Sequence, residues 1–370
     1  MSEERYRTAL LDWLACAAGG REEPAAQAAR AIGDRVAFAG TAGHVLDFDD
    51  TYLPGIAHLS APTAPAALVV AAGLGRDARA ALDAYAAGFE AMGALARAGH
   101  PALYDRHWHP TALCGGVGAA VAAAALLGAS RDDAVALALL RASGLRAAFG
   151  SHGKSLQVGL AASSGVEAAR LAAAGARVPL APAARGYEAA TGGTYAEPDP
   201  QRPAVDENWI KAWPCCLQTH GAIEAAASIR DGAPERLTVH VHPVSLQAAA
   251  QGAEPRDGLQ AKFSIPYLTA FTLLHGPPRV ESFESVLPKV VERARQVEVR
   301  SDDALLESEF VLTNGGAELA RVKAALGSPD QPMDAQALRQ KAERLGGEEL
   351  AGALDDLGRP AADLLELAGL

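Results

Sequence analysis

Two long segments without a single charged side chain set the strongest limit on how this chain folds. Residues 51–75 and 107–130 contain no Asp, Glu, Lys or Arg and consist mainly of Ala, Gly and Val, with Pro and His. Alanine is nearly neutral to membrane insertion, which Leu and Phe drive, so neither segment is typical of a transmembrane helix. Helices with small apolar residues on every side pack closely among other helices. The two segments therefore predict the central helices of a multi-helix domain.

Alanine-rich blocks continue through the first two hundred residues and predict that this region is almost entirely helical. Gly, Pro, Asn, Asp or Ser separates one block from the next, as expected where helices begin and end. The expected helices cover 6–18, 61–75, 77–98, 111–128, 131–147 and 160–175. Five prolines interrupt 176–206, so we expect an irregular connection there.

After residue 206 the pattern changes to strands that alternate with helices. Alternation of apolar and polar residues predicts strands at 237–242 and 296–300. A third strand at 309–313 is followed by Asn314-Gly315, a tight-turn pair, and by a fourth strand at 318–322. The expected helices between them cover 217–230, 264–274 and 283–295.

These patterns predict a mainly α protein with a large all-helical domain and a smaller α/β domain. At 370 residues the chain is longer than one hydrophobic core usually supports, so two domains are expected. We place the helical domain at 1–206 and the α/β domain at 207–325. Helical periodicity returns from Asp334, so 326–370 is expected to form a C-terminal helical segment that packs on the helical domain.

Composition excludes several classes of function. The formal net charge of −11 and the absence of a Lys/Arg run argue against a nucleic-acid partner. Four unevenly spaced cysteines, Cys16, Cys114, Cys215 and Cys216, are too few for a disulfide framework. The acidic N-terminus has no apolar segment of the kind found in signal peptides. We therefore expect a cytoplasmic protein that binds no membrane.

Residues 43–58 carry the densest group of chemically active side chains. They hold three carboxylates, a threonine and two histidines, next to a charge-free segment. Burial and neighbouring charges move the pKa values of such groups toward neutrality, as proton-transfer chemistry requires. Asp47 and Thr51 are one helical turn apart and would share a face if this segment were helical. The alternative is that the acids only cap a helix.

Two further segments add a histidine and a lysine. His109 precedes Pro110 at the start of the second charge-free segment, and histidine is the usual acid or base near neutral pH. Lys154 is the only Lys or Arg between Arg146 and Arg170. A lone ammonium among glycines and apolar residues is costly unless it meets an anion, which is either a substrate or a partner within the protein.

In combination these motifs resemble the MmgE/PrpD family, which includes 2-methylcitrate dehydratase, cis-aconitate decarboxylase and an iminodisuccinate epimerase. The matching motifs follow the family's order along nearly the whole chain. They are H-x-L-D-F-D-D-T with H-x-S-A-P (44–62), H-P-T (109–111), G-S-x-x-K (150–154), P-x-C-x-x-T-H (214–220), K-F-S-I-P-Y (262–267) and G-S-P-x-x-P (327–332). The resemblance implies an α/β domain that acts as a lid, a homodimer, and an active site without cofactor or metal.

Carried over by motif position, the resemblance also implies the site residues. The expected catalytic residues are Asp47, His58, His109 and Lys154, and the expected substrate contacts are Thr51, Tyr267 and Gln157. For Tyr267 the alternative is a core tyrosine whose hydroxyl is bonded within the protein. His240 and His242 share a strand face but lack an evident third ligand, so we expect no metal there.

Three positions depart from the family. Many relatives have His and Arg where this chain has Gln157 and Leu160, and Leu217 replaces a frequent Arg. Arginine is the preferred partner of carboxylates. These departures suggest a substrate with fewer carboxylates than citrate-type molecules.

The resemblance implies a lyase that removes a proton next to a carboxylate or carbonyl of a small organic acid and then releases water or CO₂. We expect Lys154 to bind the carboxylate, His109 with Asp47 to transfer the proton, and His58 with Thr51 to position the substrate or assist the leaving group. A dehydratase is favoured over a decarboxylase. The alternatives are an isomerase or epimerase, a non-catalytic homologue, and a metal-dependent hydrolase that would use His107, His109 and the acids of 47–50.

Overall fold

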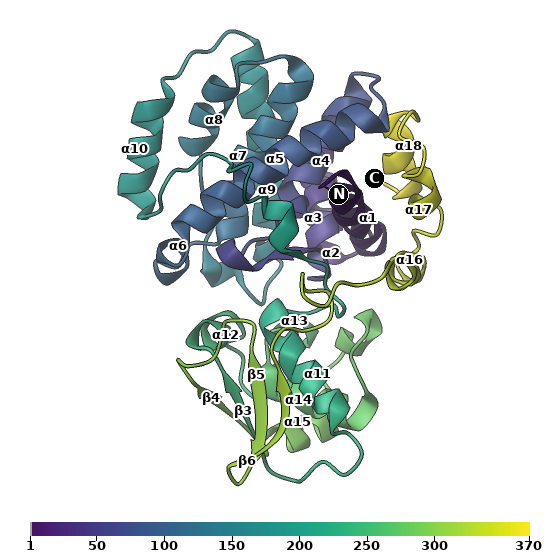
Figure 1. Cartoon of the computed structure of the whole chain (residues 1–370). Helices are drawn as coiled ribbons and strands as arrows, with labels where there is room; N and C mark the ends of the chain where they lie inside the picture. The colour runs from purple at the N-terminus through teal and green to yellow at the C-terminus, as the bar shows by residue number, and fades with distance from the viewer. Residues whose placement is uncertain (1) are drawn as a thin grey trace. The chain divides into compact units, whose positions relative to one another are not determined.

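The computed structural model describes residues 2–370 and has 58% of its residues in helices and 9% in strands, which confirms the mainly α fold (Figure 1). The chain forms two compact units. The helical unit runs up to Ile210 and resumes over Asp334–Leu370, and the α/β unit covers Lys211–Met333.

The helical unit contains most of the helices. Its elements up to residue 210 are α1 (Ser2–Gly20), α2 (Pro24–Ala31), α3 (Arg35–Val45), β1 (Thr51–Tyr52), η1 (Leu53–Gly55), α4 (Ser60–Gly73), α5 (Ala78–Gly99), α6 (Ala102–Asp105), α7 (Pro110–Leu127), α8 (Arg131–Leu139), η2 (Arg146–Ala148), α9 (Gly153–Ala173), α10 (Leu180–Thr191), η3 (Ala204–Glu207) and β2 (Asn208–Trp209).

Local sequence signals explain where several of these helices begin and end. The Asp34 side chain accepts hydrogen bonds from the first turn of α3, and Asp77 does so for α5. Pro110 occupies the first position of α7, where a missing N–H costs nothing. Gly128 ends the same helix in the left-handed conformation, at φ 64°.

Small residues allow the central helices to approach each other closely. A Cβ added to Gly165 of α9 would lie 2.3 Å from the carbonyl oxygen of Gly116 in α7. Among the described residues, α7 is the one helix long and apolar enough to cross a membrane, and 78% of it is buried in the fold. Burial of this kind is typical of a core helix, as the charge-free segment predicts.

The C-terminal segment belongs to the helical unit. It contains α16 (Ala335–Arg344), α17 (Leu350–Ala353) and α18 (Ala361–Leu367), which lie beside α1 (Figure 1). Lys341 in α16 is buried, and its Nζ donates to Asp12 Oδ1 at 2.6 Å and to the Phe48 carbonyl oxygen at 2.7 Å. Helix α16 therefore contacts the segment that follows α3.

The α/β unit is built on one four-stranded sheet with the order β4-β3-β5-β6. The strands are β3 (Leu237–Val241), β4 (Val297–Ser301), β5 (Phe310–Asn314) and β6 (Ala317–Val322). β3 pairs with β4 in parallel, whereas β5 is antiparallel to β3 and to β6. The other elements are η4 (Leu217–Thr219), α11 (His220–Ser228), α12 (Pro243–Ala248), α13 (Gly258–Ala261), α14 (Ile265–His275), η5 (Val280–Phe283) and α15 (Pro288–Ala294).

Several expected elements differ from the structure. Helix α9 begins at Gly153 instead of residue 160, and α2 and α3 are not among the expected helices. Helix α8 ends at Leu139 instead of residue 147, and the chain has φ 128° at Gly144, within the segment expected to be helical. The segment expected to be irregular contains α10, since Pro179 precedes that helix and Pro182 lies in its first turn, where proline is tolerated. Helix α15 begins only at Pro288.

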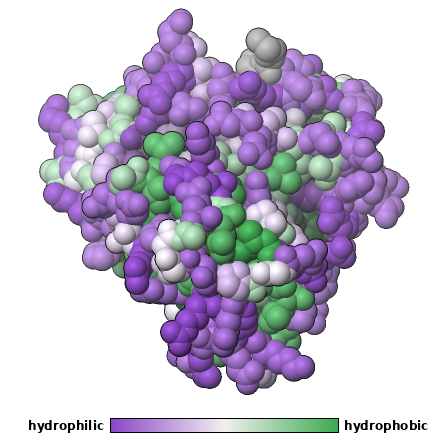
Figure 2. Space-filling view, turned by 60° about the horizontal axis from the view of Figure 1, so that its bottom comes forward, coloured by the Kyte–Doolittle hydropathy of each residue, from purple (hydrophilic) through white to green (hydrophobic). Residues whose placement is uncertain are grey.

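The surface is mostly polar. Figure 2 shows one face on which hydrophilic residues predominate and hydrophobic residues gather in a few patches. Large apolar side chains that are exposed in the helical unit include Leu140, Leu145 and Leu160, at 63%, 52% and 51%. Leu145 and Leu160 line a cavity next to the site described below.

Candidate active site

A left-handed residue creates the turn that carries the acids. Helix α3 ends at Val45, and Asp47 has φ 56°, a conformation that Asp adopts more readily than most residues. Thr51 then begins β1. The expectation that Asp47 and Thr51 share a helical face is therefore wrong. The turn instead places Asp47 against Lys154 of α9, whereas Asp49 contacts His44 of α3.

Lys154 and Asp47 form a buried ion pair. The Lys154 Nζ donates to Asp47 Oδ1 at 2.8 Å, and the two side chains are 10% and 5% exposed. Lys154 lies in the first turn of α9, and its Nζ lies 5.7 Å from the centre of the Phe149 ring. The lysine thus meets an anion within the protein, which is one of the two expected alternatives. Binding of a substrate anion remains a prediction.

Asp49 lies between two histidines and is fully buried. Its carboxylate lies 2.9 Å from His44 Nδ1 and 3.3 Å from His58 Nδ1. Burial alone would raise the pKa of Asp49, but the adjacent His44 and His58 hold that pKa well below its usual value. Asp49 is therefore a carboxylate at neutral pH.

His58 lies between two carboxylates. Besides the contact with Asp49, its Nε2 lies 3.9 Å from Asp47 Oδ1. Its Nδ1 is also 3.5 Å from the Thr51 hydroxyl oxygen, and its backbone N–H donates to the Thr111 hydroxyl. The two rings of His44 and His58 meet edge to face, with their centres 4.5 Å apart.

His109 has a different environment. It is buried at the N-terminus of α7, its ring stacks on His44 at 6.2 Å, and the edge of Phe149 lies 5.0 Å away. Burial, with the charge of Lys154, holds the pKa of His109 well below its usual value. Burial also lowers the pKa of His44, against the effect of Asp49. His109 and His44 are therefore neutral imidazoles at neutral pH.

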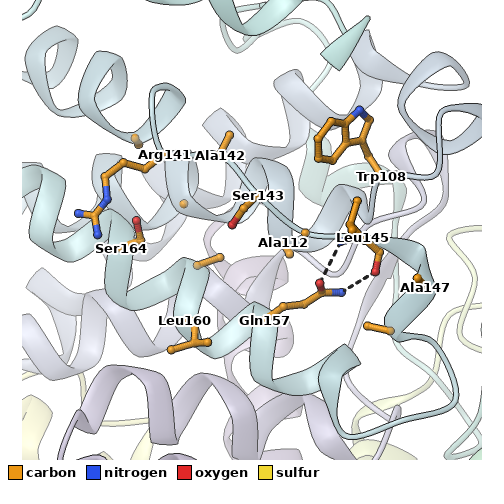
Figure 3. A pocket seen from close by; sticks show the side chains of 15 residues that line it. Trp108, Ala112, Arg141, Ala142, Ser143, Leu145, Ala147, Gln157, Leu160 and Ser164 are labelled. Carbon is orange, nitrogen blue, oxygen red and sulfur yellow. Dashed lines mark hydrogen bonds between the residues drawn. The ribbon is translucent and has the colours of Figure 1, made fainter. Parts of the chain in front are cut away.

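Gln157 connects His109 to the backbone of the segment before α9. Its Oε1 accepts from Leu145 N at 3.0 Å, and its Nε2 donates to Leu145 O at 3.2 Å (Figure 3). The same Nε2 also donates to His109 Nδ1 at 2.6 Å. Gln157 also borders a cavity of about 790 Å³. Apolar groups make up most of the cavity lining, to which Trp108, Leu145 and Leu160 contribute, and Arg141 and Ser164 add polar groups. Asp47, His58, His109 and Lys154 do not line it, so this cavity is not where the charged groups meet.

The structure thus brings together six of the seven expected site residues: Asp47, Thr51, His58, His109, Lys154 and Gln157. Tyr267 belongs to the α/β unit, where it is buried and its hydroxyl accepts from Leu287 N at 3.0 Å. Its expected contact with the substrate remains a prediction. Sequence reasoning did not single out His44 and Asp49, although both lie in the first motif and only their spacing could have indicated the pair.

One group of side chains has the composition of a metal site. Ligand atoms of His44, Asp49 and His58 all lie within 4.8 Å of one another. The distance of 2.9 Å from His44 Nδ1 to the Asp49 carboxylate is that of a hydrogen bond, and the 3.3 Å from His58 Nδ1 is that of a close ion-pair contact. The set proposed for a hydrolase differs from this group, and its His107 is exposed.

Known proteins of one name are similar to this chain. The chain is 28% identical to cis-aconitate decarboxylase of Mus musculus in an alignment of 342 positions that covers 82% of this chain and 69% of that protein. It is 30% identical to the Homo sapiens protein of the same name in an alignment of 289 positions that covers 70% of this chain and 60% of that protein. For the Aspergillus terreus cis-aconitate decarboxylase the identity is 28% in an alignment of 232 positions that covers 53% of this chain and 47% of that protein.

Two family models together match most of the chain. The MmgE/PrpD N-terminal domain matches residues 34–194, and the MmgE/PrpD C-terminal domain matches residues 213–355. The first of these ranges includes Asp47, Asp49, His58, His109 and Lys154. The motifs that suggested the family therefore lie within regions that the family models recognise, and the chain belongs to the MmgE/PrpD family.

Proposed function

We propose that this protein is a lyase that acts on a small organic acid by moving a proton at the carbon next to a carboxylate or carbonyl. The observation that carries the proposal is one buried group of side chains that are connected by pairwise contacts. It consists of the Lys154 ammonium, the carboxylates of Asp47 and Asp49, and the imidazoles of His44, His58 and His109. Membership of a family whose relatives include cis-aconitate decarboxylases supports it.

The charges of the group suit a carbanion-like intermediate. Removal of a proton next to a carboxylate leaves negative charge on the carboxylate oxygens, and an ammonium held in a buried site stabilises such charge. Lys154 would bind the substrate carboxylate and exchange part of its contact with Asp47 for it. The imidazoles supply proton transfer, since neutral histidines such as His109 both donate and accept protons.

The leaving group is water or CO₂. The family's range of activities favours loss of water, whereas the names of the relatives support loss of CO₂. Gln157 and Leu160, which replace frequent His and Arg, support a substrate with fewer carboxylates than citrate. We also propose that the enzyme is a cytoplasmic homodimer that needs no cofactor.

An epimerase is the second candidate. His58 and His109 come from different segments of the chain, and two separate imidazoles are what removal and return of a proton on opposite faces of one carbon requires. Such an enzyme would retain every proton-transfer residue and release no group. Retention of Asp47, His109 and Lys154 argues against a non-catalytic homologue.

Proton NMR in D₂O with a panel of acids tests the proposal. The panel contains 2-methylcitrate, citrate, cis-aconitate, iminodisuccinate and simpler mono- and dicarboxylates, and Lys154→Ala is the control. New vinyl signals or release of CO₂ would support a lyase, and deuterium at one carbon without loss of atoms would support the epimerase. If no acid changes, or if Lys154→Ala reacts as fast as the parent protein, the proposal is wrong. Metal analysis that finds a stoichiometric Zn or Mn would favour the hydrolase instead.

A further inference from the structure

We infer that the protein holds its two site histidines in opposite tautomers, so that His58 is the base and His109 is a neutral hydrogen-bond donor. Asp49 and Gln157 are the positioning residues that set these tautomers. The inference rests on the proposed function and assigns its proton-transfer step to one residue. It reverses the expectation that His109 carries the proton.

Asp49 determines the tautomer of His58. An ionised carboxylate only accepts hydrogen bonds and repels the lone pair of a ring nitrogen, so a ring nitrogen that faces it at close range carries the hydrogen. The Asp49 carboxylate faces Nδ1 of His58 at 3.3 Å and Nδ1 of His44 at 2.9 Å. In the neutral ring a hydrogen on Nδ1 leaves the lone pair on Nε2. The Nε2 of His58 is therefore the atom that accepts a proton.

Gln157 determines the opposite tautomer for His109. A side-chain amide offers one acceptor and one donor group, and their assignment follows from the hydrogen bonds that surround them. The backbone N–H of Leu145 needs an acceptor, so Oε1 of Gln157 faces it, and the carbonyl oxygen of Leu145 needs a donor, so the amide nitrogen faces that oxygen. These two bonds fix the orientation of the Gln157 amide. The amide nitrogen then donates to His109 Nδ1 at 2.6 Å. The hydrogen of the neutral His109 ring is consequently on Nε2.

The charges around the two rings agree with this division. His58 lies between the carboxylates of Asp49 and Asp47, which stabilise the imidazolium that forms when it takes up a proton. His109 is buried beside the positive charge of Lys154, which disfavours a second positive charge. A neutral histidine that donates to a developing oxyanion, opposite a separate base, is an established arrangement for enolate chemistry.

In the first step His58 Nε2 takes the proton from the substrate carbon, and the electron pair of the broken C–H bond moves into the adjacent carboxylate or carbonyl. The oxygen that gains this charge accepts a hydrogen bond from His109 Nε2–H and faces Lys154. When the C–O bond breaks, the proton on His58 passes to the departing hydroxide and gives water. For loss of CO₂, His58 Nε2 first takes a proton from solvent, the C–C bond to the carboxylate breaks, and this proton then passes from His58 to the carbanion that remains. His109 keeps its proton throughout.

Nitrogen NMR of the resting protein tests the tautomers without any substrate. Two-bond ¹H–¹⁵N correlation of protein labelled in histidine distinguishes the two neutral tautomers, and His58→Gln and His109→Gln assign the signals. We expect the hydrogen on Nδ1 of His58 and on Nε2 of His109. The opposite tautomer for either ring would overturn the inference, whether or not a substrate has been found.

Two positioning variants sharpen this measurement. Gln157→Glu places a carboxylate against His109 Nδ1, and we expect the hydrogen of that ring to move to Nδ1. The matched control is Leu160→Ala, one helical turn further along α9 and exposed at 51%, which should leave both tautomers unchanged. A hydrogen that stays on Nε2 in Gln157→Glu would show that Gln157 does not set the tautomer.

Kinetics with whichever acid reacts test the assigned roles. His58→Gln should slow deuterium exchange at the substrate carbon by at least about 10²-fold, the usual contribution of a general base. His109→Gln retains an N–H donor and should exchange faster than His58→Gln. Asp49→Asn should move the acid limb of kcat/KM down by about one pH unit, because the imidazolium loses a neighbouring charge. Faster exchange in His58→Gln than in His109→Gln, or an unmoved acid limb, would overturn the assignment while leaving the proposed lyase intact.

Discussion

Two buried lysine–aspartate pairs lie in the helical unit, and they differ in what surrounds them. Lys341 pairs with Asp12 at 2.6 Å, donates to the Phe48 carbonyl, and covers the Phe48 ring at 3.8 Å. Lys154 pairs with Asp47, the residue next to Phe48, at 2.8 Å. Side chains of the first pair are 3% and 0% exposed, and those of the second are 10% and 5% exposed.

The difference separates a structural ion pair from a candidate catalytic one. Lys341 bonds to a backbone carbonyl and an apolar ring, and these contacts fix the position of a chain segment. Lys154 is instead surrounded by groups that titrate or exchange protons, namely Asp47, His58 and His109. Two pairs of the same chemistry thus support different functions, and burial alone does not distinguish them.

Removal of the Lys341 charge should have the largest effect on stability. Lys341→Met leaves the Asp12 carboxylate buried without its ammonium, and breaking a buried pair in this way costs about 3–5 kcal/mol of unfolding free energy. Urea unfolding of the variant measures the loss. The double variant with Asp12→Leu should recover much of it. A loss below about 1 kcal/mol would mean that the pair does not support the fold.

Removal of the Lys154 charge should instead affect activity most. Lys154→Met should lower kcat by about 10²–10³-fold, the usual result of removing one donor that stabilises an oxyanion. We expect a smaller loss of unfolding free energy than for Lys341→Met, because the Lys154 pair is more exposed. Lys154→Arg is the control that keeps the positive charge. Equal activity in Lys154→Met and the parent protein would remove the contrast between the two pairs.

The close contact between α7 and α9 should make the fold sensitive to a larger residue at Gly165. Gly165→Ala places a Cβ 2.3 Å from the Gly116 carbonyl oxygen, and overpacking of this kind costs about 1–3 kcal/mol. The matched control is Gly186→Ala in α10, where nothing lies within 4 Å of the added Cβ. That change should stabilise the protein by up to about 1 kcal/mol, since alanine is the better helix former. Similar unfolding free energies for both variants would contradict the tight packing.

Another buried aspartate, Asp50, bonds to Ser60 and Asn208 instead of a lysine. Burial and the adjacent Asp49 raise the pKa of Asp50 to about 7. Between pH 4 and 7 the folded protein therefore binds this proton more tightly than the unfolded chain. The unfolding free energy should fall as pH rises, by about 1.4 kcal/mol per pH unit from this group.

Asp50→Asn isolates that effect, because the amide cannot ionise. Urea unfolding of the parent protein and the variant at pH 5 and pH 6 should show the parent losing about 1.4 kcal/mol relative to the variant. His44, His109 and Asp49 are present in both proteins, so the comparison removes most of their contribution. A constant difference between the two proteins at both pH values would mean that Asp50 is already ionised at pH 5.

Sequence reasoning succeeded where a pattern is local. Charge-free segments predicted the buried helices α4 and α7, and the cost of an isolated ammonium predicted that Lys154 meets an anion. It failed where the outcome depends on one backbone angle or on distant contacts. The helical face expected for Asp47 and Thr51 is lost because Asp47 adopts a positive φ. Nothing near Lys341 in the sequence indicates its contact with Asp12, because 329 residues separate them.

The pair formed by Lys341 and Asp12 also has a consequence for how the protein is made. The helical unit is interrupted in the chain, since Lys211–Met333 forms a separate unit before the helical unit resumes at Asp334. The ribosome therefore synthesises the whole α/β unit before it adds Lys341, the residue that pairs with Asp12 and donates to the Phe48 carbonyl. Domains usually fold in order from the N-terminus. In this chain the region translated first is therefore completed last, because the ion pair between Asp12 and Lys341 cannot form until α16 has been synthesised.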